Sequence, residues 1–245
     1  YAQWHYPFEN QEVFKNNFPA NFIAEGVDQT RGWFYTLHAI AAMVFDSVAF
    51  KNVVSNGLVL DKEGNKMSKS KGNVVDPFET IAEYGADATR WYMMANANPW
   101  DNLKFDTGGI IEVRNKLFGT LFNTYNFFAL YANLDGFKMD EFKVLPYNNR
   151  TELDRWIISK LYSLVADYRE AMDDYDVTRA CRAIEEFVDE HLSNWFVRLS
   201  RRRFWKGELN DDKTAAYQTL FECLMVTSQL MSSVAPFFSD WLYRN

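Results

Sequence analysis

The spacing of apolar residues changes near residue 105, and this change constrains the fold more than any other feature of the sequence. Before it, short apolar runs of strand length alternate with helical segments. After it, apolar residues recur at every third or fourth position almost to the end of the 245 residues. Side chains repeat every second residue in a strand and about every 3.6 residues in a helix. The sequence therefore predicts an α/β part with parallel strands, residues 1–106, followed by an all-α helix bundle, residues 107–245.

The first part has the pattern of a strand, a helix and a second strand. We expect a buried strand at residues 21–25, ended by Gly26, an apolar helix at about 32–46 and a second strand at 53–60. This order is typical of a βαβ unit, in which ligands bind at the carboxyl ends of parallel strands. Further helices are expected at 77–84, with Asp76 as N-cap, and at 87–96, before a polar connector at 98–107.

The second part has the pattern of an antiparallel helix bundle. We expect one helix ending near residue 133, a linker at 138–150, and helices at 151–173, 177–204 and 212–234, with Pro236 ending the last. The helix at 177–204 is predicted to bury a seam of residues three or four positions apart. The seam is Val177, Cys181, Ile184, Val188, His191, Trp195 and Leu199. Because its neighbours are apolar, His191 is expected to be a packing residue and not a ligand.

Composition limits the class of protein. The chain is 48% hydrophobic and 17% aromatic, enough for a packed core, and it has no uncharged apolar run of membrane-spanning length and no secretion signal. Cys181 and Cys223 have neither disulfide nor zinc spacing, so we expect no metal site and a reducing, cytoplasmic location. A first residue other than Met suggests a piece of a longer polypeptide. The net charge of −7 argues against indiscriminate nucleic-acid binding but permits local basic surfaces.

Residues Lys66–Asn73 contain three lysines and two serines within eight positions. Lysine ammoniums supply positive charge, serine hydroxyls supply donors, and Gly64 and Gly72 allow close approach of the backbone to an anion. A solvated basic surface turn is the alternative interpretation. The position of the segment after a predicted parallel strand favours a polyphosphate-binding loop.

The segment Glu25–Phe34 is rich in polar residues where the first strand meets the helix. Backbone N–H groups at such a helix start attract anions and ribose hydroxyls, and carboxylates suit a sugar diol or a substrate ammonium. An ordinary polar turn with Asp28 as N-cap is the alternative.

Together, Glu25–Trp33, Asn56-Gly57 and Lys66–Ser70 resemble the carboxyl-terminal half of the catalytic domain of class I aminoacyl-tRNA synthetases, and in particular the isoleucyl branch. Residues 154–157, 183–187, 193–198 and 201–205 are similar to the helical anticodon-binding domain of that family. The resemblance implies that residues 1–106 form half of a Rossmann-type nucleotide-binding fold. It also implies that residues 107–245 form an anticodon-binding bundle, truncated at its carboxyl end.

The resemblance implies a reaction in which isoleucine and ATP give isoleucyl-adenylate and pyrophosphate, and the acyl group then moves to tRNA(Ile). Substrates would be isoleucine and ATP with Mg²⁺, and the parent protein would be a monomer. By match to the family motifs, the ATP-phosphate loop is Lys66, Met67, Ser68, Lys69 and Ser70, in which Lys66 and Lys69 are catalytic. The adenylate would be bound by Glu25, Gly26, Asp28 and Gln29, by Trp33 as a wall of the isoleucine pocket, and by the backbone of Gly57 and Leu58 at the adenine.

A basic stripe near residue 200 has two interpretations. It comprises Arg198, Arg201, Arg202, Arg203 and Lys206, interleaved with Trp195, Phe196, Phe204 and Trp205. The resemblance implies that Arg198, Arg201, Arg202, Arg203 and Trp205 bind tRNA, through phosphates and by stacking on anticodon-loop bases. Alternatively, the cations complement the helix dipole and the aromatic residues belong to the core.

The chain also departs from the family pattern. Thr30 stands where many bacterial members have histidine, and no His-x-Gly-His motif for the ATP phosphates surrounds His5, His38 or His191. The editing insertion is also missing. The isolated chain is therefore expected not to activate isoleucine. Two alternatives stay open at this point: a valyl- or leucyl-tRNA synthetase fragment, and a non-catalytic helical tRNA-binding module.

Overall fold

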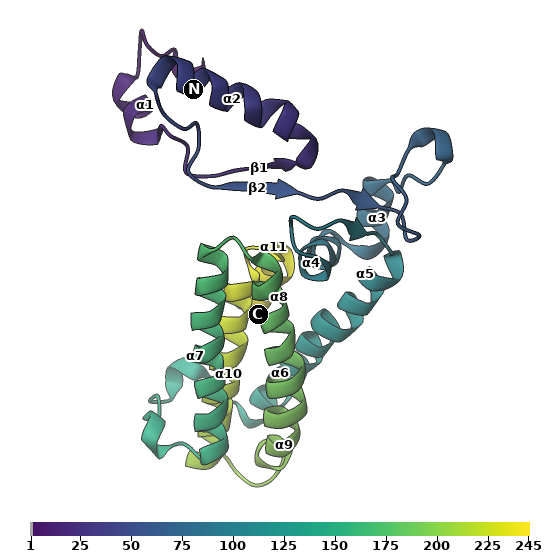
Figure 1. Cartoon of the computed structure of the whole chain (residues 1–245). Helices are drawn as coiled ribbons and strands as arrows, with labels where there is room; N and C mark the ends of the chain where they lie inside the picture. Colours follow the sequence, from purple (N-terminus) through teal and green to yellow (C-terminus); the bar gives the residue numbers. More distant parts are fainter. Residues whose placement is uncertain (1) are drawn as a thin grey trace.

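The structure is a computed structural model that describes residues 2–245. In Figure 1 the amino-terminal helices α1 and α2 and the strands β1 and β2 form one group above a bundle of long helices. Helices α3, α4 and α5 lie between this group and the bundle. The predicted order, parallel strands first and a helix bundle second, is confirmed.

A parallel strand pair organises the amino-terminal group. Strand β1 (Ile23–Gly26) pairs with β2 (Val53–Asn56), and helix α2 (Trp33–Phe45) connects them. The predicted βαβ unit is therefore present. Helix α1 (Gln11–Asn17) packs on the end of α2 through rings, and Phe14 lies 5.2 Å from Phe45 between ring centroids.

The prediction of one continuous strand at residues 53–60 is wrong. The segment divides into β2 and a short β3 (Val59–Leu60), which pairs with β4 (Leu103–Lys104) and not with β1. The division occurs at Gly57. Its N–H donates to the carbonyl of Pro99 at 2.8 Å, so the chain leaves the first sheet at this residue. The connector predicted to be irregular therefore contains a strand, which its polar composition concealed.

Two helices follow the lysine-rich segment. Helix α3 (Pro77–Tyr84) begins as predicted, with the Asp76 carboxylate accepting from the N–H groups of Phe78 and Glu79 at 2.8 and 3.1 Å. Such a cap contributes about 1 kcal/mol. Helix α4 (Ala86–Asn96) buries Trp91 completely, which joins this helix to the core of the bundle.

The bundle contains the predicted helices with changes at their ends. Helices α5 (Thr107–Val113) and α6 (Gly119–Asp135) are joined by a π-helical turn, Arg114–Phe118. Helix α7 spans Glu152–Asp173, and α8 (Val177–Glu186) continues through a π-helical segment, Phe187–Val197, into α9 (Arg198–Trp205). Helix α10 spans Asp211–Met231.

Pro236 begins a further helix, α11 (Pro236–Arg244), because proline is suited to the first helical position. Its predicted role in ending the preceding helix is wrong.

The buried seam of the α8–α9 helix differs from the predicted one beyond Val188. Cys181, Ile184 and Val188 are buried as expected, but Trp195 and Leu199 are exposed. The π-helical segment has more residues per turn, so its buried positions recur every fourth residue and the seam moves to another face. The observed seam continues through Leu192, Phe196, Ser200 and Phe204, all fully buried.

His191 lies at the edge of this seam. It is half-buried and packs edge-on against Trp156, with ring centroids 5.7 Å apart. Burial lowers the pKa of His191 from its ordinary value, with Lys160 as a second cause. Its predicted packing role is confirmed.

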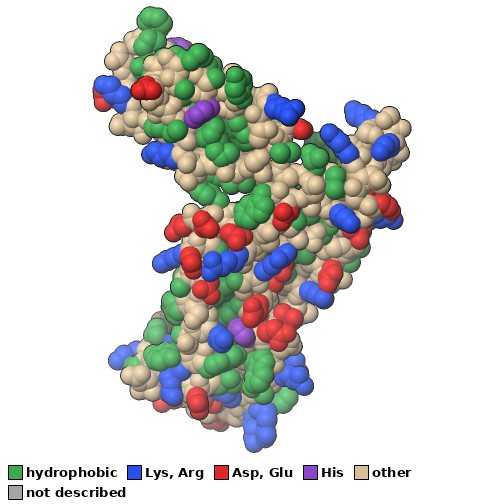
Figure 2. Space-filling view, in the orientation of Figure 1, with side chains coloured by type: hydrophobic (Ala, Val, Ile, Leu, Met, Phe, Trp, Pro, Cys, Tyr) green, Lys and Arg blue, Asp and Glu red, His purple; other side chains and the backbone are tan. Residues whose placement is uncertain are grey.

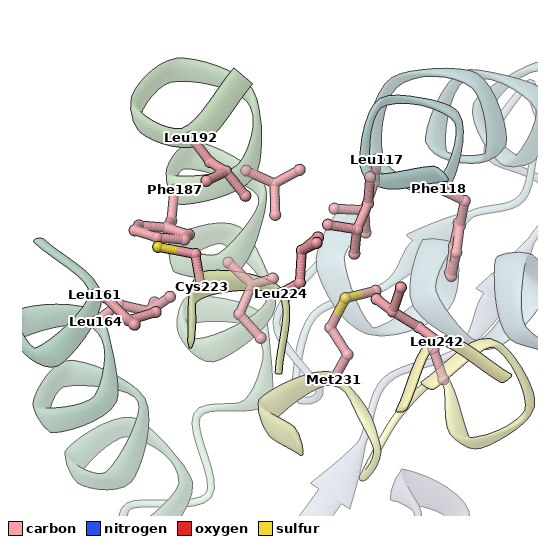
Figure 3. Close-up of a cluster of buried hydrophobic side chains, with 14 of the residues drawn as sticks. Leu117, Phe118, Leu161, Leu164, Phe187, Leu192, Cys223, Leu224, Met231 and Leu242 are labelled. Atoms are coloured by element: carbon pink, nitrogen blue, oxygen red, sulfur yellow. The ribbon is translucent and has the colours of Figure 1, made fainter. Parts of the chain in front are cut away.

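The core of the bundle joins all of its long helices. Figure 3 shows Leu161 and Leu164 of α7 facing Phe187 of the π-helical segment, and Cys223 and Leu224 of α10 between them and Leu117. Both cysteines are free and buried, and burial raises the pKa of Cys181 to about 12. They are therefore unreactive core residues.

Candidate active site

The register of the two parallel strands brings two predicted ligand-binding segments together. Glu25 pairs with Ser55, and Gly26 pairs with Asn56, so both strands end at the same edge. The turn Val27–Arg31 leaves one strand there, and Gly57 leaves the other. This edge is where parallel sheets bind ligands. Glu25, Gly26, Asp28 and Gly57 are thereby placed around one strand edge.

A side-chain cap shapes the turn after β1. The carboxamide oxygen of Gln29 accepts from the N–H of Trp33 at 2.8 Å and so satisfies the start of α2. A Cβ on Gly32 would lie 2.8 Å from this oxygen, so Gly32 gives the Gln29 side chain its room. The hydroxyl of Thr30 donates to the carbonyl of Val27 at 2.8 Å, so the Thr30 side chain forms a hydrogen bond within this turn.

The side chains around this edge are open to solvent. Glu25 and Asp28 are exposed, and Trp33 is 52% exposed on the first turn of α2. Only Phe34 and Ala41 of α2 are buried, and Figure 2 shows hydrophobic side chains gathered over the amino-terminal group. The apolar helix predicted from the sequence therefore presents much of its apolar surface outward.

Gly57 and Leu58 are held by the connector that follows α4. A Cβ on Gly57 would lie 2.1 Å from the carbonyl oxygen of Asp101, so no larger residue fits without moving the backbone. The N–H of Leu58 donates to the side-chain oxygen of Asn102 at 2.8 Å. These contacts fix the backbone that the sequence predicts to face adenine.

One amide side chain, that of Asn73, closes the lysine loop, residues 61–73. Its oxygen accepts from the N–H of Ser68 at 2.9 Å, and its Nδ2 donates to Asp61 at 2.8 Å and to the carbonyl of Lys66 at 3.3 Å. The Asn73 hydrogen bond is the main cause that lowers the pKa of Asp61, followed by the N–H of Asn65. A short 3₁₀ helix, Lys69–Lys71, occupies the outer end of the loop.

The positive charges of the lysine loop face solvent. Lys66, Lys69 and Lys71 are exposed, and within the described residues the one ion pair of this loop joins Lys62 to Glu63. In Figure 2 basic side chains gather over the loop at the upper right of the molecule. Met67 turns inward and packs against the core. The loop thus combines an apolar anchor with three cations free to bind an anion.

The lysine loop and the turn after β1 are separate in this structure. Among residues 2–245, the hydrogen bonds of the loop stay within the segment Asp61–Asn73 apart from its pairing with β3. Figure 1 shows β2 running from the strand pair toward α3, beyond which the loop lies. A ligand that touches both segments would have to span the distance between them.

Arg203 of the basic stripe is directed into the protein. Its Nη1 and Nη2 donate to the two carboxylate oxygens of Asp154 at 2.8 Å each, and it also binds Asp212. Asp154 is fully buried, and it completes a capping box with Thr151 at the start of α7. The guanidinium therefore joins α9 to α7 and α10 and is occupied inside the bundle.

The other members of the stripe divide between core and surface. Phe196 and Phe204 are fully buried. Trp195 and Trp205 are exposed by more than half, next to the exposed side chains of Arg198, Arg201 and Arg202. The two phenylalanines therefore belong to the core, whereas the tRNA contacts of the exposed residues stay a prediction.

Two asparagines that the motifs do not mark as site residues support the site. Asn73 lies in the lysine loop, and Asn102 lies in the connector after α4. Both bind backbone groups of predicted site residues, Ser68 and Leu58. Asparagine beside glycine or in a turn-rich segment was the available signal, since its side chain readily bonds to nearby backbone.

A hollow of about 500 Å³ lies elsewhere, between α4, α5 and α8. Glutamates 112, 185, 186 and 190 line it, with Lys116 and Arg182. Glu185 accepts a hydrogen bond of 2.8 Å from the indole of Trp91, and burial raises its pKa. The hollow contains no residue predicted to bind the adenylate.

Within residues 2–245, no three His, Cys, Asp or Glu side chains are grouped as metal ligands. No helix in the same range is long and apolar enough to cross a membrane.

Two family models match the chain. Residues 1–106 match tRNA synthetases class I (I, L, M and V), and residues 154–245 match the anticodon-binding domain of tRNA ligase. The isoleucine–tRNA ligase of Cytophaga hutchinsonii is 66% identical over 245 residues, 100% of this chain. The chain therefore joins a class I tRNA synthetase domain to an anticodon-binding domain of tRNA ligases. The resemblance found in the sequence is confirmed.

Two further isoleucine–tRNA ligases match the whole of this chain. The isoleucine–tRNA ligase of Porphyromonas gingivalis is 62% identical over 247 residues, and that of Thermus thermophilus is 49% identical over 245. The chain covers 22% of the Cytophaga and Porphyromonas proteins and 23% of the Thermus protein. It thus spans about a fifth of the length of these synthetases.

Solved structures of the class share the fold. Methionyl-tRNA synthetase of Mycobacterium tuberculosis, bound by methionyl-adenylate, matches 98% of this chain and 46% of its own, with a TM-score of 0.77 and 20% identity. The LeuRS of Agrobacterium radiobacter K84, in a ternary complex with tRNA and LeuAMS, matches 96% of this chain and 28% of its own, with a TM-score of 0.71 and 18% identity.

Proposed function

We propose that this chain is the part of an isoleucine–tRNA ligase that supplies one side of the adenylate site and the adjoining tRNA-binding helices. The observation that carries the proposal is the parallel register that places Glu25 and Gly26 beside Asn56 and Gly57. A strand edge that bears the exposed carboxylates of Glu25 and Asp28 suits the ribose and amino group of an aminoacyl-adenylate. The relatives named isoleucine–tRNA ligase share the whole chain.

In this function Lys66 and Lys69 bind the pyrophosphate of ATP, presented with Mg²⁺, as it leaves. Charge grows on the α-phosphate in the transition state, and positioned cations stabilise it electrostatically. Both lysines are exposed on a loop closed by Asn73, so the charges are available to a ligand. The lysine loop must approach the turn after β1 for both segments to contact one adenylate. Met67, which packs against the core, anchors the loop.

The tRNA-binding surface comprises Arg198, Arg201, Arg202 and Trp205. All four are exposed along α9, which suits contacts to phosphates and stacking on unpaired bases. Arg203 is left out of this surface, because its guanidinium already binds Asp154 and Asp212. Its contribution to the bundle is structural.

ATP–pyrophosphate exchange tests the proposal. A full-length ligase that contains these 245 residues is assayed separately with isoleucine, valine and leucine. Exchange with isoleucine at a kcat/KM about 100-fold above that with valine is expected, since one methylene supports discrimination of that order. Exchange that prefers valine or leucine would contradict the proposal.

A further inference from the structure

The corner between α7 and α8 touches both segments that carry the proposed adenylate site. In Figure 1 this corner lies at the upper end of the bundle, below β1 and β2. Tyr175 in the corner stacks on Phe22, directly before β1, with ring centroids 4.7 Å apart and planes inclined by 16°. Tyr175 has a φ of +60°, which is unusual for a bulky residue and directs the chain around the corner.

Two side chains of α8 bind the end of α4. The hydroxyl of Thr178 lies 2.7 Å from the carbonyl of Met94 and 2.9 Å from that of Ala97. Arg182 donates through Nε to the carbonyl of Ala95 at 2.8 Å and through Nη2 to that of Asn96 at 3.0 Å. The last carbonyls of a helix have no partner within it, so these bonds fix where α4 ends.

The segment that leaves α4 at this point is the connector that holds the predicted adenine contact. Pro99 accepts from the N–H of Gly57, and Asn102 accepts from the N–H of Leu58. The contacts therefore run without interruption from Thr178 through the end of α4 to the backbone of Gly57 and Leu58. Thr178 is buried, and the hydrogen bonds of its hydroxyl go to the end of α4.

We infer that the α7–α8 corner is a positioning device for the nucleotide site, in which Thr178 and Arg182 set the adenine-binding backbone and Tyr175 sets β1. The inference rests on the proposed function, because it takes the backbone of Gly57 and Leu58 as the adenine contact. Thr178, Arg182 and Tyr175 are positioning residues, since each acts through another segment. A helix of the proposed tRNA-binding part thereby determines the affinity for ATP.

Steady-state exchange kinetics of a full-length ligase containing these residues test the inference. Thr178→Val keeps the shape of the side chain and removes its hydroxyl, and we expect KM for ATP to rise about tenfold with KM for isoleucine within about twofold. Thr178→Ser restores the hydroxyl and should restore KM for ATP. Arg179→Ala is the matched control, because Arg179 is exposed on the same helix and pairs with Glu170.

A purely structural role predicts a different result. Partial unfolding lowers the concentration of active enzyme and so lowers kcat without a selective change in the KM for ATP. An unchanged KM for ATP in Thr178→Val, or an equal rise in Thr178→Ser, would overturn the inference. Should Thr178→Val fail to fold, Asn102→Leu is the second variant. It removes the hydrogen bond from the N–H of Leu58 at an exposed residue, and the same rise in KM for ATP is expected.

The ring of Tyr175 is tested in the same way. Tyr175→Asn tolerates the positive φ but removes the ring, whereas Tyr175→Phe keeps it. We expect the asparagine variant to raise KM for both substrates and the phenylalanine variant to match the unchanged enzyme. Equal KM values for the two variants would overturn this part of the inference.

Hydrogen exchange separates this inference from the proposed function. In Thr178→Val, the amides of residues 98 and 100–102 and of Leu58 should exchange faster than in Thr178→Ser, whether or not the ligase uses isoleucine. Unchanged exchange there overturns the positioning role, whereas absent isoleucine-dependent activity in the unchanged enzyme overturns the proposed function.

Discussion

The guanidinium of Arg203 binds the buried carboxylate of Asp154 through two hydrogen bonds of 2.8 Å each. The two residues are 49 positions apart, and the pair joins the end of α9 to the start of α7. Such bidentate pairs are the strongest and most directional of the ionic contacts in proteins. This contact changes the expected role of the basic stripe, because one of its arginines supports the fold.

Arg203→Ala should destabilise the bundle strongly. The variant leaves the Asp154 carboxylate buried without its cation, which costs about 3–5 kcal/mol. Urea unfolding of the chain followed by circular dichroism measures this loss. Arg201→Ala is the matched control and should change the free energy of unfolding by less than about 0.5 kcal/mol, because Arg201 is exposed.

The Arg201→Ala variant also tests the tRNA-binding surface. Arg201→Ala should weaken tRNA binding and reduce the slope of affinity against salt concentration by about one, the amount expected for one lost phosphate contact. Filter binding at several salt concentrations gives this slope. An Arg201→Ala protein with unchanged affinity and slope would remove Arg201 from the surface.

Asn73→Ala should release the lysine loop. The substitution removes the amide that binds Asp61, Ser68 and Lys66, so the amides of residues 66–72 should exchange faster with solvent. The pKa of Asp61 should rise toward its ordinary value, because its main lowering cause is lost. NMR titration of the Asp61 carboxyl measures that change, and Lys62→Ala, on the same loop, is the control that should leave it unaltered.

Glu185→Gln should raise the melting temperature at pH 7. Burial raises the pKa of Glu185, so its carboxyl favours the folded state below its ordinary pKa and opposes folding once it is ionised. Glutamine keeps an oxygen that accepts from the indole of Trp91 but carries no charge. The difference in melting temperature should therefore shrink as the pH falls to about 4, near the ordinary glutamate pKa. A difference that is independent of pH would show that charge is not its cause.

Lys69→Ala in a full-length ligase should lower the rate of adenylate formation about 100-fold with a smaller change in KM for isoleucine. A lost positioned cation costs about 3 kcal/mol in the transition state, by analogy with a lost oxyanion donor. Single-turnover formation of adenylate measures the rate. Lys71→Ala is the matched comparison, because Lys71 is exposed two positions further along the same loop.

The isolated 245-residue chain should show no isoleucine-dependent ATP–pyrophosphate exchange, because it contains no His-x-Gly-His motif.

The sequence alone determined the local features whose causes lie within a few residues. Asp76 with Pro77 predicts the start of α3, and the alternation of apolar runs predicts β1, α2 and β2. The motifs around Glu25 and Lys66 predicted the family, since they depend on residue type and order. The tertiary structure decided the features that depend on distant partners. Pairing with β4 divided the predicted strand at Gly57, and the π-helical segment moved the seam away from Trp195. Arg203 is directed inward because it binds Asp154, although Arg203 stands in the same basic segment as its exposed neighbours. The physical reason is that hydrogen bonding and burial between distant segments outweigh the small differences in local preference that a sequence pattern records.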